Sequence, residues 1–208
     1  MNYVDAISRL EAGLQGTLPG EAAQSLLAPR PRRRWPPGIH ASQIRDAAGL
    51  LAVFPRAARA HILLTVRADS LRHGGQVSLP GGVVDDGETY EAAALREAEE
   101  EVGLAPDTVR VLGALTPLDI PVSGFRLHPI VGALTSHPHL RASDGEVARI
   151  LEIDLDHLFD QSTIIETERT RDGHVLRIPA FSVDGEEVWG ATAMVLAEFL
   201  TVLGWTRD

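Results

Sequence analysis

The sequence predicts a layered α/β or α+β fold, in which strands interleave with two or three helices. Short apolar runs edged by polar or turn-forming residues recur after residue 45, and apolar residues at helical spacing mark separate segments. The 208 residues, 44% of them hydrophobic and 23% charged, suffice for a buried core without disulfide or metal support. We therefore expect an N-terminal helix and Pro/Arg-rich connector over residues 1–40, followed by one domain over residues 41–208.

The composition excludes several classes of protein. The chain has no cysteine, which rules out a disulfide framework, a thiolate zinc site and a cysteine nucleophile. No apolar run approaches the roughly 18 residues of a membrane-spanning helix, so we expect a cytoplasmic protein that does not bind membranes. The net charge of −10 disfavours nucleic acid as a partner, because its phosphates would be repelled. A small-molecule substrate is expected instead.

The N-terminal elements come first in the chain. A helix over the first fifteen residues is predicted by apolar residues at helical spacing, namely Val4, Ile7, Leu10 and Leu14. Residues 30–37 follow, with arginines at 30, 32, 33 and 34 among prolines. We interpret this segment as a solvated connector, because a nucleic-acid or membrane patch would need more basic residues.

The later elements are predicted from the same two patterns, short apolar runs for strands and apolar residues at helical spacing for helices. Strands are predicted over residues 48–54, 61–67, 109–115, 126–134, 147–153 and 174–183. A glycine-rich turn at 74–82 precedes a helix over 89–102, and Gly103 stands where a helix C-terminus favours glycine. A last amphipathic helix is predicted over 191–203.

Three glutamates crowd the last turns of the predicted helix 89–102. Glu97, Glu100 and Glu101 are spaced i, i+3 and i+4 and therefore share one helix face. Like charges at this spacing are mutually destabilising, and the C-terminal end of a helix is already negative. A solvated acidic face is one interpretation. The other is a countercharge that the sequence does not contain, and hard divalent cations such as Mg²⁺ would supply it.

The segment from residue 82 to 104 resembles the Nudix box, the signature of the Nudix hydrolases. That pattern is glycine, five residues, glutamate, seven residues, Arg-Glu, an apolar residue, a free position, Glu-Glu, a free position, glycine and an apolar residue. Every position is matched, by Gly82, Glu88, Arg96, Glu97, Ala98, Glu100, Glu101, Gly103 and Leu104. Seven strict matches arise by chance in on the order of one window in 10⁸.

The resemblance implies a fold, a reaction and site residues. The fold is a mixed central sheet sandwiched between helices, and the reaction is attack of water on a diphosphate with Mg²⁺ or Mn²⁺ as cofactor. Glu97 and Glu101 would be the leading metal ligands, with Glu100 close behind. Arg96 would orient Glu97 or neutralise part of the cluster, and Glu88 would anchor the box loop.

Further acid and histidine candidates are weighed against the same family pattern. Glu97 is the first choice for the general base, because it can touch metal and accept a proton from water. Glu146 opens a predicted strand and is an additional candidate for metal ligand or base. His73, His137 and His139 are interpreted as loop or surface residues, because a Nudix site is built of oxygen ligands.

The stretch just before the box is similar to the extra signature of the coenzyme A pyrophosphatase branch. That signature has Leu-Leu-Thr, a free position, arginine, serine or alanine, then a spaced arginine and glycine before Phe-Pro-Gly-Gly. Here it is represented by Leu63, Leu64, Thr65, Arg67, Ala68, Arg72, Gly75, Pro80, Gly81 and Gly82. Leu79 replaces the phenylalanine, and the gap from Arg72 to Gly75 is one residue short. Segments 121–132 and 188–193 also resemble this branch.

The branch resemblance implies hydrolysis of coenzyme A or acyl-coenzyme A to (acyl-)4′-phosphopantetheine and 3′,5′-ADP. Arg67 and Arg72 would bind phosphate through their guanidinium forks. Alternatively, Arg67 merely ends a strand and pairs with an acid. Gly81 and Gly82 would let backbone approach the substrate, although turn formation alone would also explain them.

Other interpretations stay open at this stage. Ser123 and Phe125 would either line the pantetheine path or pack within a loop. Within the enzyme class, the substrate could instead be ADP-ribose, NADH or a nucleoside triphosphate. From another class, the chain could be a non-catalytic nucleotide-binding Nudix module. The family resemblance also favours a homodimer.

Overall fold

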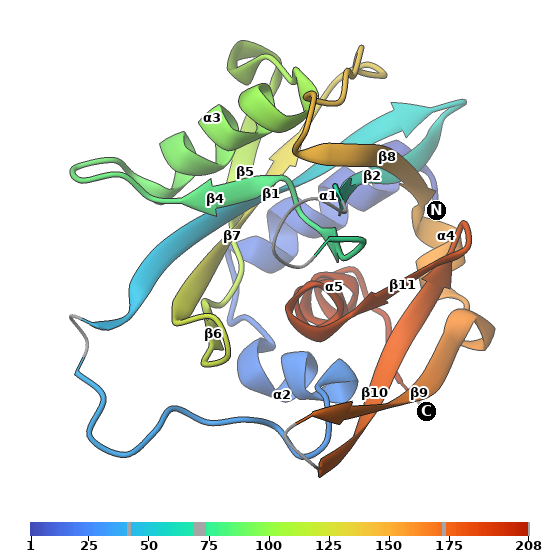
Figure 1. Cartoon of the computed structure of the whole chain (residues 1–208). Helices are drawn as coiled ribbons and strands as arrows, with labels where there is room; N and C mark the ends of the chain where they lie inside the picture. Colours follow the sequence, from blue (N-terminus) through green and yellow to red (C-terminus); the bar gives the residue numbers. More distant parts are fainter. Residues whose placement is uncertain (41–42, 69–73, 172–173, 208) are drawn as a thin grey trace.

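A mixed β-sheet forms the centre of the computed structural model, which describes residues 1–40, 43–68, 74–171 and 174–207 (Figure 1). The central strand β1 (Arg45–Arg56) pairs antiparallel with β2 (Arg59–Arg67) and β4 (Gly81–Val83). On its other edge β1 pairs parallel with β7 (Phe125–Ala133). This parallel pair among antiparallel ones confirms the mixed sheet predicted from the sequence.

The remaining strands extend the main sheet and form a smaller one. The strand order of the main sheet is β3-β2-β1-β7-β5, and in addition β6 pairs with β7 and β8 pairs with β2. The strands not yet described are β3 (Val77–Ser78), β5 (Arg110–Ala114), β6 (Leu118–Ile120) and β8 (Val147–Asp154). The smaller antiparallel sheet contains β9 (Ile164–Arg171), β10 (His174–Val183) and β11 (Glu186–Trp189). The two sheets lie on opposite sides of the C-terminal helix (Figure 1).

Helices complete the layers. Their bounds are α1 (Tyr3–Leu14), α2 (Gly20–Gln24), α3 (Tyr90–Val102), α4 (Leu155–Phe159) and α5 (Gly190–Val202), with short 3₁₀ turns at Ser25–Leu27, Pro106–Thr108 and Gln161–Thr163. Helix α3 covers one face of the main sheet, and α5 with α1 covers the other (Figure 1). The predicted α/β class is confirmed. No helix in the described part of the chain is both long and apolar enough to cross a membrane.

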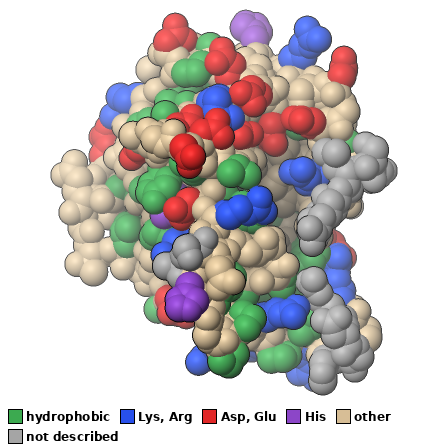
Figure 2. Space-filling model, turned by 60° about the vertical axis from the view of Figure 1, so that its left-hand side comes forward, with side chains coloured by type: hydrophobic (Ala, Val, Ile, Leu, Met, Phe, Trp, Pro, Cys, Tyr) green, Lys and Arg blue, Asp and Glu red, His purple; other side chains and the backbone are tan. Residues whose placement is uncertain are grey.

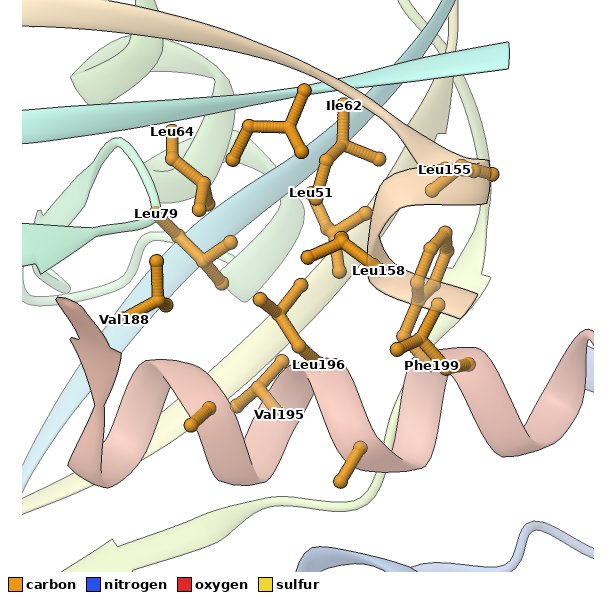
Figure 3. Close-up of a cluster of buried hydrophobic side chains, with 14 of the residues drawn as sticks. Leu51, Ile62, Leu64, Leu79, Leu155, Leu158, Val188, Val195, Leu196 and Phe199 are labelled. Atoms are coloured by element: carbon orange, nitrogen blue, oxygen red, sulfur yellow. The ribbon is translucent and has the colours of Figure 1, made fainter. Parts of the chain in front are cut away.

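Strand β1 is buried on both faces, and its alternate residues serve two cores. Leu51 and Val53 belong to the core beneath α5, whereas Leu50 and Phe54 belong to the core beneath α3. Burial on both sides explains why β1 is a nearly continuous apolar run rather than an alternating one. In the α5 core the side chains of sheet and helix point toward one another, as Figure 3 shows for Leu51, Ile62, Leu64, Leu196 and Phe199.

Helix α5 differs from the prediction of an amphipathic helix. All residues from Thr192 to Leu200 are buried, including Glu198, so the helix has no solvent face over this stretch. The cause is tertiary: main-sheet strands pack on one side of α5, while α2 and the smaller sheet pack on others. A helix covered all round is apolar all round, apart from side chains with dedicated partners.

Helix α1 is predicted and found, and it joins the α5 core through Ala6, Ile7 and Leu10. The segment after it, which the sequence suggests is a solvated connector, is mostly exposed between residues 30 and 40. Its start is fastened by a pair of backbone hydrogen bonds between Arg30 and Arg177 of β10, at 2.8 and 3.0 Å. The division of the chain at residue 40 stays a prediction.

Glu198 is a buried carboxylate that joins three parts of the fold. Its Oε1 accepts hydrogen bonds from the Thr116 hydroxyl at 2.6 Å and from the backbone N–H groups of Thr116 and Gly20 at 3.2 and 3.1 Å. Its Oε2 accepts one from the Gln24 side-chain amide at 2.9 Å. Helix α5 is thereby tied to α2 and to the turn between β5 and β6. A buried charge is tolerated here because four donors satisfy it.

We expect Glu198→Ala to lower the free energy of unfolding by about 3–5 kcal/mol, because it strands several buried donors at once. Glu99→Ala, an exposed glutamate on α3, is the control and should change stability by no more than about 0.5 kcal/mol. Urea unfolding of both variants measures the difference. Equal losses in the two variants would contradict the role assigned to Glu198.

Candidate active site

Helix α3 is held against the sheet at both ends and along one face. At its start the Thr89 hydroxyl oxygen accepts a hydrogen bond from the Ala92 N–H at 3.2 Å, and at its end Gly103 adopts a left-handed conformation with φ of 67°. Ala93, Ala94 and Ala98 are buried toward β1. Because these side chains are small, the helix lies close to the sheet, and its residues Glu97 and Glu101 contact β4.

Arg96 is the hub of the polar network on α3. Its guanidinium grips Glu88 with two hydrogen bonds, Nε to Oε1 at 3.0 Å and Nη2 to Oε2 at 3.1 Å. Nη1 donates to Oε1 of Glu97 at 2.8 Å, and Nη2 also donates to the carbonyl of Val83 at 3.1 Å. These bonds raise the pKa of Arg96 and lower the pKa of Glu88. The loop between β4 and α3 is thus fastened to the helix.

The sequence predicts that the glutamate cluster needs a countercharge, from divalent cations and in part from Arg96. Arg96 supplies part of it, to Glu97 and also to Glu100, whose Oε1 lies 3.5 Å from Nη1. Arg96 precedes Glu100 by four residues, a spacing at which helix side chains meet. Glu101 is different, since it forms no ion pair within the described residues.

Glu101 is the carboxyl group of the cluster that lacks compensation. The pKa of Glu101 is raised to about 7, mainly by burial and to a smaller extent by the charges of Glu97 and Glu146. The N–H of Gly81, which donates to Oε2 at 3.3 Å, and the positive charge of Arg67 act in the opposite direction. A positive ligand beside Glu101 would stabilise its ionised form.

Gly81 and Gly82 lie on β4, and close contact rather than a turn requires them to be glycine. A Cβ on Gly81 would lie 2.3 Å from the carbonyl oxygen of Ala48 in β1. A Cβ on Gly82 would lie 2.5 Å from the carboxylate carbon of Glu97. The first glycine therefore lets β4 approach β1, and the second lets the Glu97 carboxylate rest on the strand.

These groups face one cavity of about 270 Å³, lined by Arg67, Gly81, Gly82, Val83, Asp85, Glu97, Glu101 and Glu146. Six of the lining residues are ones that the sequence analysis singled out. Glu97 and Glu101 come from α3, and Glu146 comes from the loop before β8. The buried Nε of Arg67 has no hydrogen-bond partner among the described residues, which is unusual for a buried donor. Figure 2 shows Asp and Glu side chains gathered on this face, with Arg side chains among them.

The donor set of the cavity fits a hard divalent cation. Within the described residues, no three acidic or histidine side chains already converge as a metal cage. Mg²⁺, however, is commonly held by one or two carboxylates and completes its coordination with waters and substrate phosphates. The buried, uncompensated carboxyl of Glu101 beside Glu97 and Glu146 meets that requirement. His137 and His139 are exposed and do not line the cavity, and His73 lies outside the described residues.

The other residues singled out from the sequence lie elsewhere. Glu100 is exposed and lies outside the cavity lining, with 57% of its side-chain surface accessible. The Ser123 hydroxyl donates to the carbonyl of Ile120 at 3.2 Å, within the turn between β6 and β7. Phe125 packs beneath the guanidinium of Arg45, 4.2 Å from its ring centroid. Arg72 lies outside the described residues.

Apart from Glu88, sequence reasoning missed the residues that line a second cavity, of about 660 Å³, at the start of α3. Its lining includes Arg45, Asp46 and Tyr90, and it shares Val83 and Asp85 with the first cavity. Two signals in the sequence could have pointed to it. Asp85 follows the box glycine closely, and Tyr90 is a large aromatic residue on the first turn of a helix.

Comparisons with known proteins agree on a family. The NUDIX domain model matches residues 43–170. The "Uncharacterized Nudix hydrolase NudL" of Citrobacter koseri is 40% identical over 162 residues, 77% of this chain and 83% of that protein, and its Klebsiella pneumoniae namesake is 38% identical over 86% and 90%. Among solved structures, a MutT/nudix family protein from Enterococcus faecalis shares the fold, with a TM-score of 0.51 over 81% of this chain and 64% of that one at 14% identity.

The two glycines of β4 predict different outcomes for the same substitution. Gly81→Ala should cost about 1–3 kcal/mol of stability, because its Cβ meets the rigid backbone of β1. Gly82→Ala should cost less, below about 1 kcal/mol, because its Cβ meets a side-chain carboxylate, which can shift at the expense of its hydrogen bond to Arg96, and not backbone. Denaturant unfolding of the two variants tests this order. A larger loss for Gly82→Ala would show that the Glu97 carboxylate is fixed more rigidly than the strand.

Proposed function

Because the chain belongs to the Nudix hydrolases, we propose that it hydrolyses the diphosphate of coenzyme A or an acyl-coenzyme A. The products would be 4′-phosphopantetheine, or its acyl form, and 3′,5′-ADP. Nudix enzymes act on diphosphate compounds and bind small nucleotide-diphosphate substrates, and the family is typically dependent on divalent metals. The finer assignment to coenzyme A depends on residues outside the box.

One observation carries the proposal: three carboxylates and one buried arginine donor face the same small cavity. Glu97, Glu101 and Glu146 supply oxygen ligands there, and Arg67 supplies a buried N–H for which the described part of the chain offers no acceptor. A diphosphate with its bound cations would suit both kinds of group, because the cations would compensate the negative charge of the carboxylates and a phosphate oxygen would accept a hydrogen bond from the Arg67 guanidinium. An acidic helix face in open solvent would not bury Glu101.

The metal site would be formed by Glu97 and Glu101 with Glu146, and Glu100 would contribute at its exposed edge. Mg²⁺ or Mn²⁺ bound there supplies charge neutralisation for the diphosphate and lowers the pKa of water. Arg96 acts as a positioning residue, because its bonds to Glu88 and Glu97 fix the carboxylate that faces the cavity.

We propose Glu97 as the general base. The hydrogen bond from Arg96 goes to Oε1, which leaves Oε2 to accept a proton from the attacking water. The contact of this carboxylate with Gly82 restrains its position at the floor of the cavity. Glu97 thus has a defined orientation, a property that proton transfer in a transition state demands.

Two arginines support coenzyme A in particular. Coenzyme A carries a 3′-phosphate in addition to its diphosphate, and guanidinium groups bind phosphates through paired hydrogen bonds. Arg67 lines the cavity, and we propose Arg72 as a further phosphate ligand. Ser123 and Phe125 stay proposed neighbours of the pantetheine arm. We also retain the proposal of a homodimer.

The substrate assignment is tested by incubating the protein with Mg²⁺ or Mn²⁺ and, separately, coenzyme A, ADP-ribose, NADH and dGTP. We expect coenzyme A to yield 3′,5′-ADP and 4′-phosphopantetheine, identified by mass spectrometry, because Arg67 and Arg72 favour a substrate with an extra phosphate. Consumption of another compound with coenzyme A left intact would overturn the branch assignment. No turnover of any of the four would favour a module that binds nucleotides without catalysis.

The role of Glu97 is tested by Glu97→Gln, which keeps the size and polarity of the side chain but removes its basicity. We expect kcat for coenzyme A to fall at least about 100-fold, because general-base catalysis contributes that much or more. The matched control is Glu99→Gln on the exposed face of the same helix, which should keep kcat within about twofold of the wild type. Unchanged turnover by Glu97→Gln would refute the role.

A further inference from the structure

The larger cavity lies directly beside the proposed diphosphate site. Its walls come from the start of β1 (Arg45 and Asp46), from the end of β4 and the loop after it, and from the first turn of α3 (Tyr90 and Glu91). Val83 and Asp85 line both cavities. The two cavities therefore adjoin at these two residues, and a substrate whose diphosphate occupies the smaller cavity has the larger one next to it.

An aromatic platform forms one wall of this cavity. The ring of Tyr90 stacks on the imidazole of His128 with centroids 3.6 Å apart and planes 9° from parallel. His128 is in turn fixed by Asp46, whose Oδ1 lies 2.9 Å from Nε2. The His128 side chain is largely buried, whereas Tyr90 is 38% exposed. One face of the tyrosine ring is thus backed by protein, and the rest of the residue lines the cavity.

A second flat group lies in the same lining. The guanidinium carbon of Arg45 lies over the ring of Phe125, 4.2 Å from the centroid, so a cation–π contact with β7 restrains this group. Arg45 and Tyr90 both line the cavity. Planar groups held in this way are suited to stacking on a flat heterocycle, because little conformational freedom is lost on binding.

The charge of the lining selects among the parts of a nucleotide. Besides Arg45 and Tyr90, the ionisable side chains that line the cavity are all carboxylic acids, namely Asp46, Asp85, Asp86, Glu88 and Glu91. A phosphate would be repelled by these carboxylates, whereas an uncharged aromatic base would not. Carboxylate oxygens also accept hydrogen bonds, which suits a base with an exocyclic amino group.

We propose that this cavity binds the base of the nucleotide substrate, with the Tyr90 ring as its stacking surface. Resting on the proposed function, we identify the base as the adenine of coenzyme A; Phe125, which lies against Arg45, would then belong to the adenine end of the substrate and not to the surroundings of the pantetheine arm. Tyr90 and Glu97 are seven residues apart on α3, which is about 10 Å along the helix axis. That separation is compatible with a nucleotide whose phosphate lies at Glu97 and whose base reaches Tyr90.

The test measures binding, by calorimetry with Mg²⁺ present, of AMP and of ribose 5-phosphate, which carry the same phosphate and differ by the base. Wild-type protein should bind AMP at least about tenfold more tightly, because stacking of one base on an aromatic side chain has about that effect. Tyr90→Ala should remove this difference and leave the affinity for ribose 5-phosphate unchanged. Tyr90→Phe, which keeps the ring, should bind AMP as the wild type does.

Several outcomes would overturn the base site. They are equal affinity of the wild type for AMP and ribose 5-phosphate, an AMP affinity that Tyr90→Ala leaves unchanged, and an equal loss of both ligands in that variant. Tight binding of nicotinamide mononucleotide without binding of AMP would also overturn it, since a different heterocycle would then be the ligand. Alanine is a good helix former at the first position of α3, so the variant should fold, and circular dichroism checks this.

The test is independent of the reaction. If wild-type protein leaves coenzyme A intact but binds AMP through Tyr90, the proposed function fails and the base site stands. If coenzyme A is cleaved with the same kcat and KM by wild type and Tyr90→Ala, the proposed function stands and the base site fails. The two results can therefore be told apart with the same set of proteins.

Discussion

The paired hydrogen bonds from Arg96 to Glu88 hold the candidate active site together. They close the loop between β4 and α3, and through the additional bond to Glu97 they set the direction of the carboxylate over Gly82. Ionic hydrogen bonds in this two-pronged geometry are stronger and more directional than neutral ones. Both cavities share walls made by this loop, so the arrangement of the whole site follows from how the arginine fastens it.

Burial supplies the rigidity on which that network depends. The strand β1 packs on α3 with one set of alternate residues and on the α5 core with the other, so neither face can shift alone. Small residues bring α3 and β4 close to this strand, and this places Glu97 and Glu101 at the sheet edge. Where elements pack this closely, a larger side chain has no room and would destabilise the fold. Gly81 is the clearest example, because a Cβ there would meet the backbone of β1.

The two cavities of the proposed site differ in the charged groups that line them, and so in the part of a substrate that each suits. In the smaller cavity, a buried carboxyl with a raised pKa lies near an arginine donor that has no acceptor within residues 1–40, 43–68, 74–171 and 174–207, so cations and phosphates would complement both groups. In the larger cavity, acids predominate around stacked aromatic and guanidinium planes, so an uncharged ring fits better than a phosphate. On the proposed assignment, this separation is what would let an acidic chain bind a highly anionic substrate.

The sequence alone determined the fold class, the helix that carries the glutamates and most of the smaller cavity. These follow from periodicity and from a motif whose members are close along the chain, so local spacing places them on one helix face. It did not reveal the short elements α2 and α4, which have too few residues to show a period, or β9, whose charged residues hide a strand that exists by pairing with β10. The local pattern could not show that Glu101 is buried with the Gly81 N–H as its hydrogen-bond donor, or that Tyr90 stacks on His128, which Asp46 in turn contacts. Those facts depend on contacts between residues far apart in the chain, and on burial, neither of which spacing along a single segment encodes.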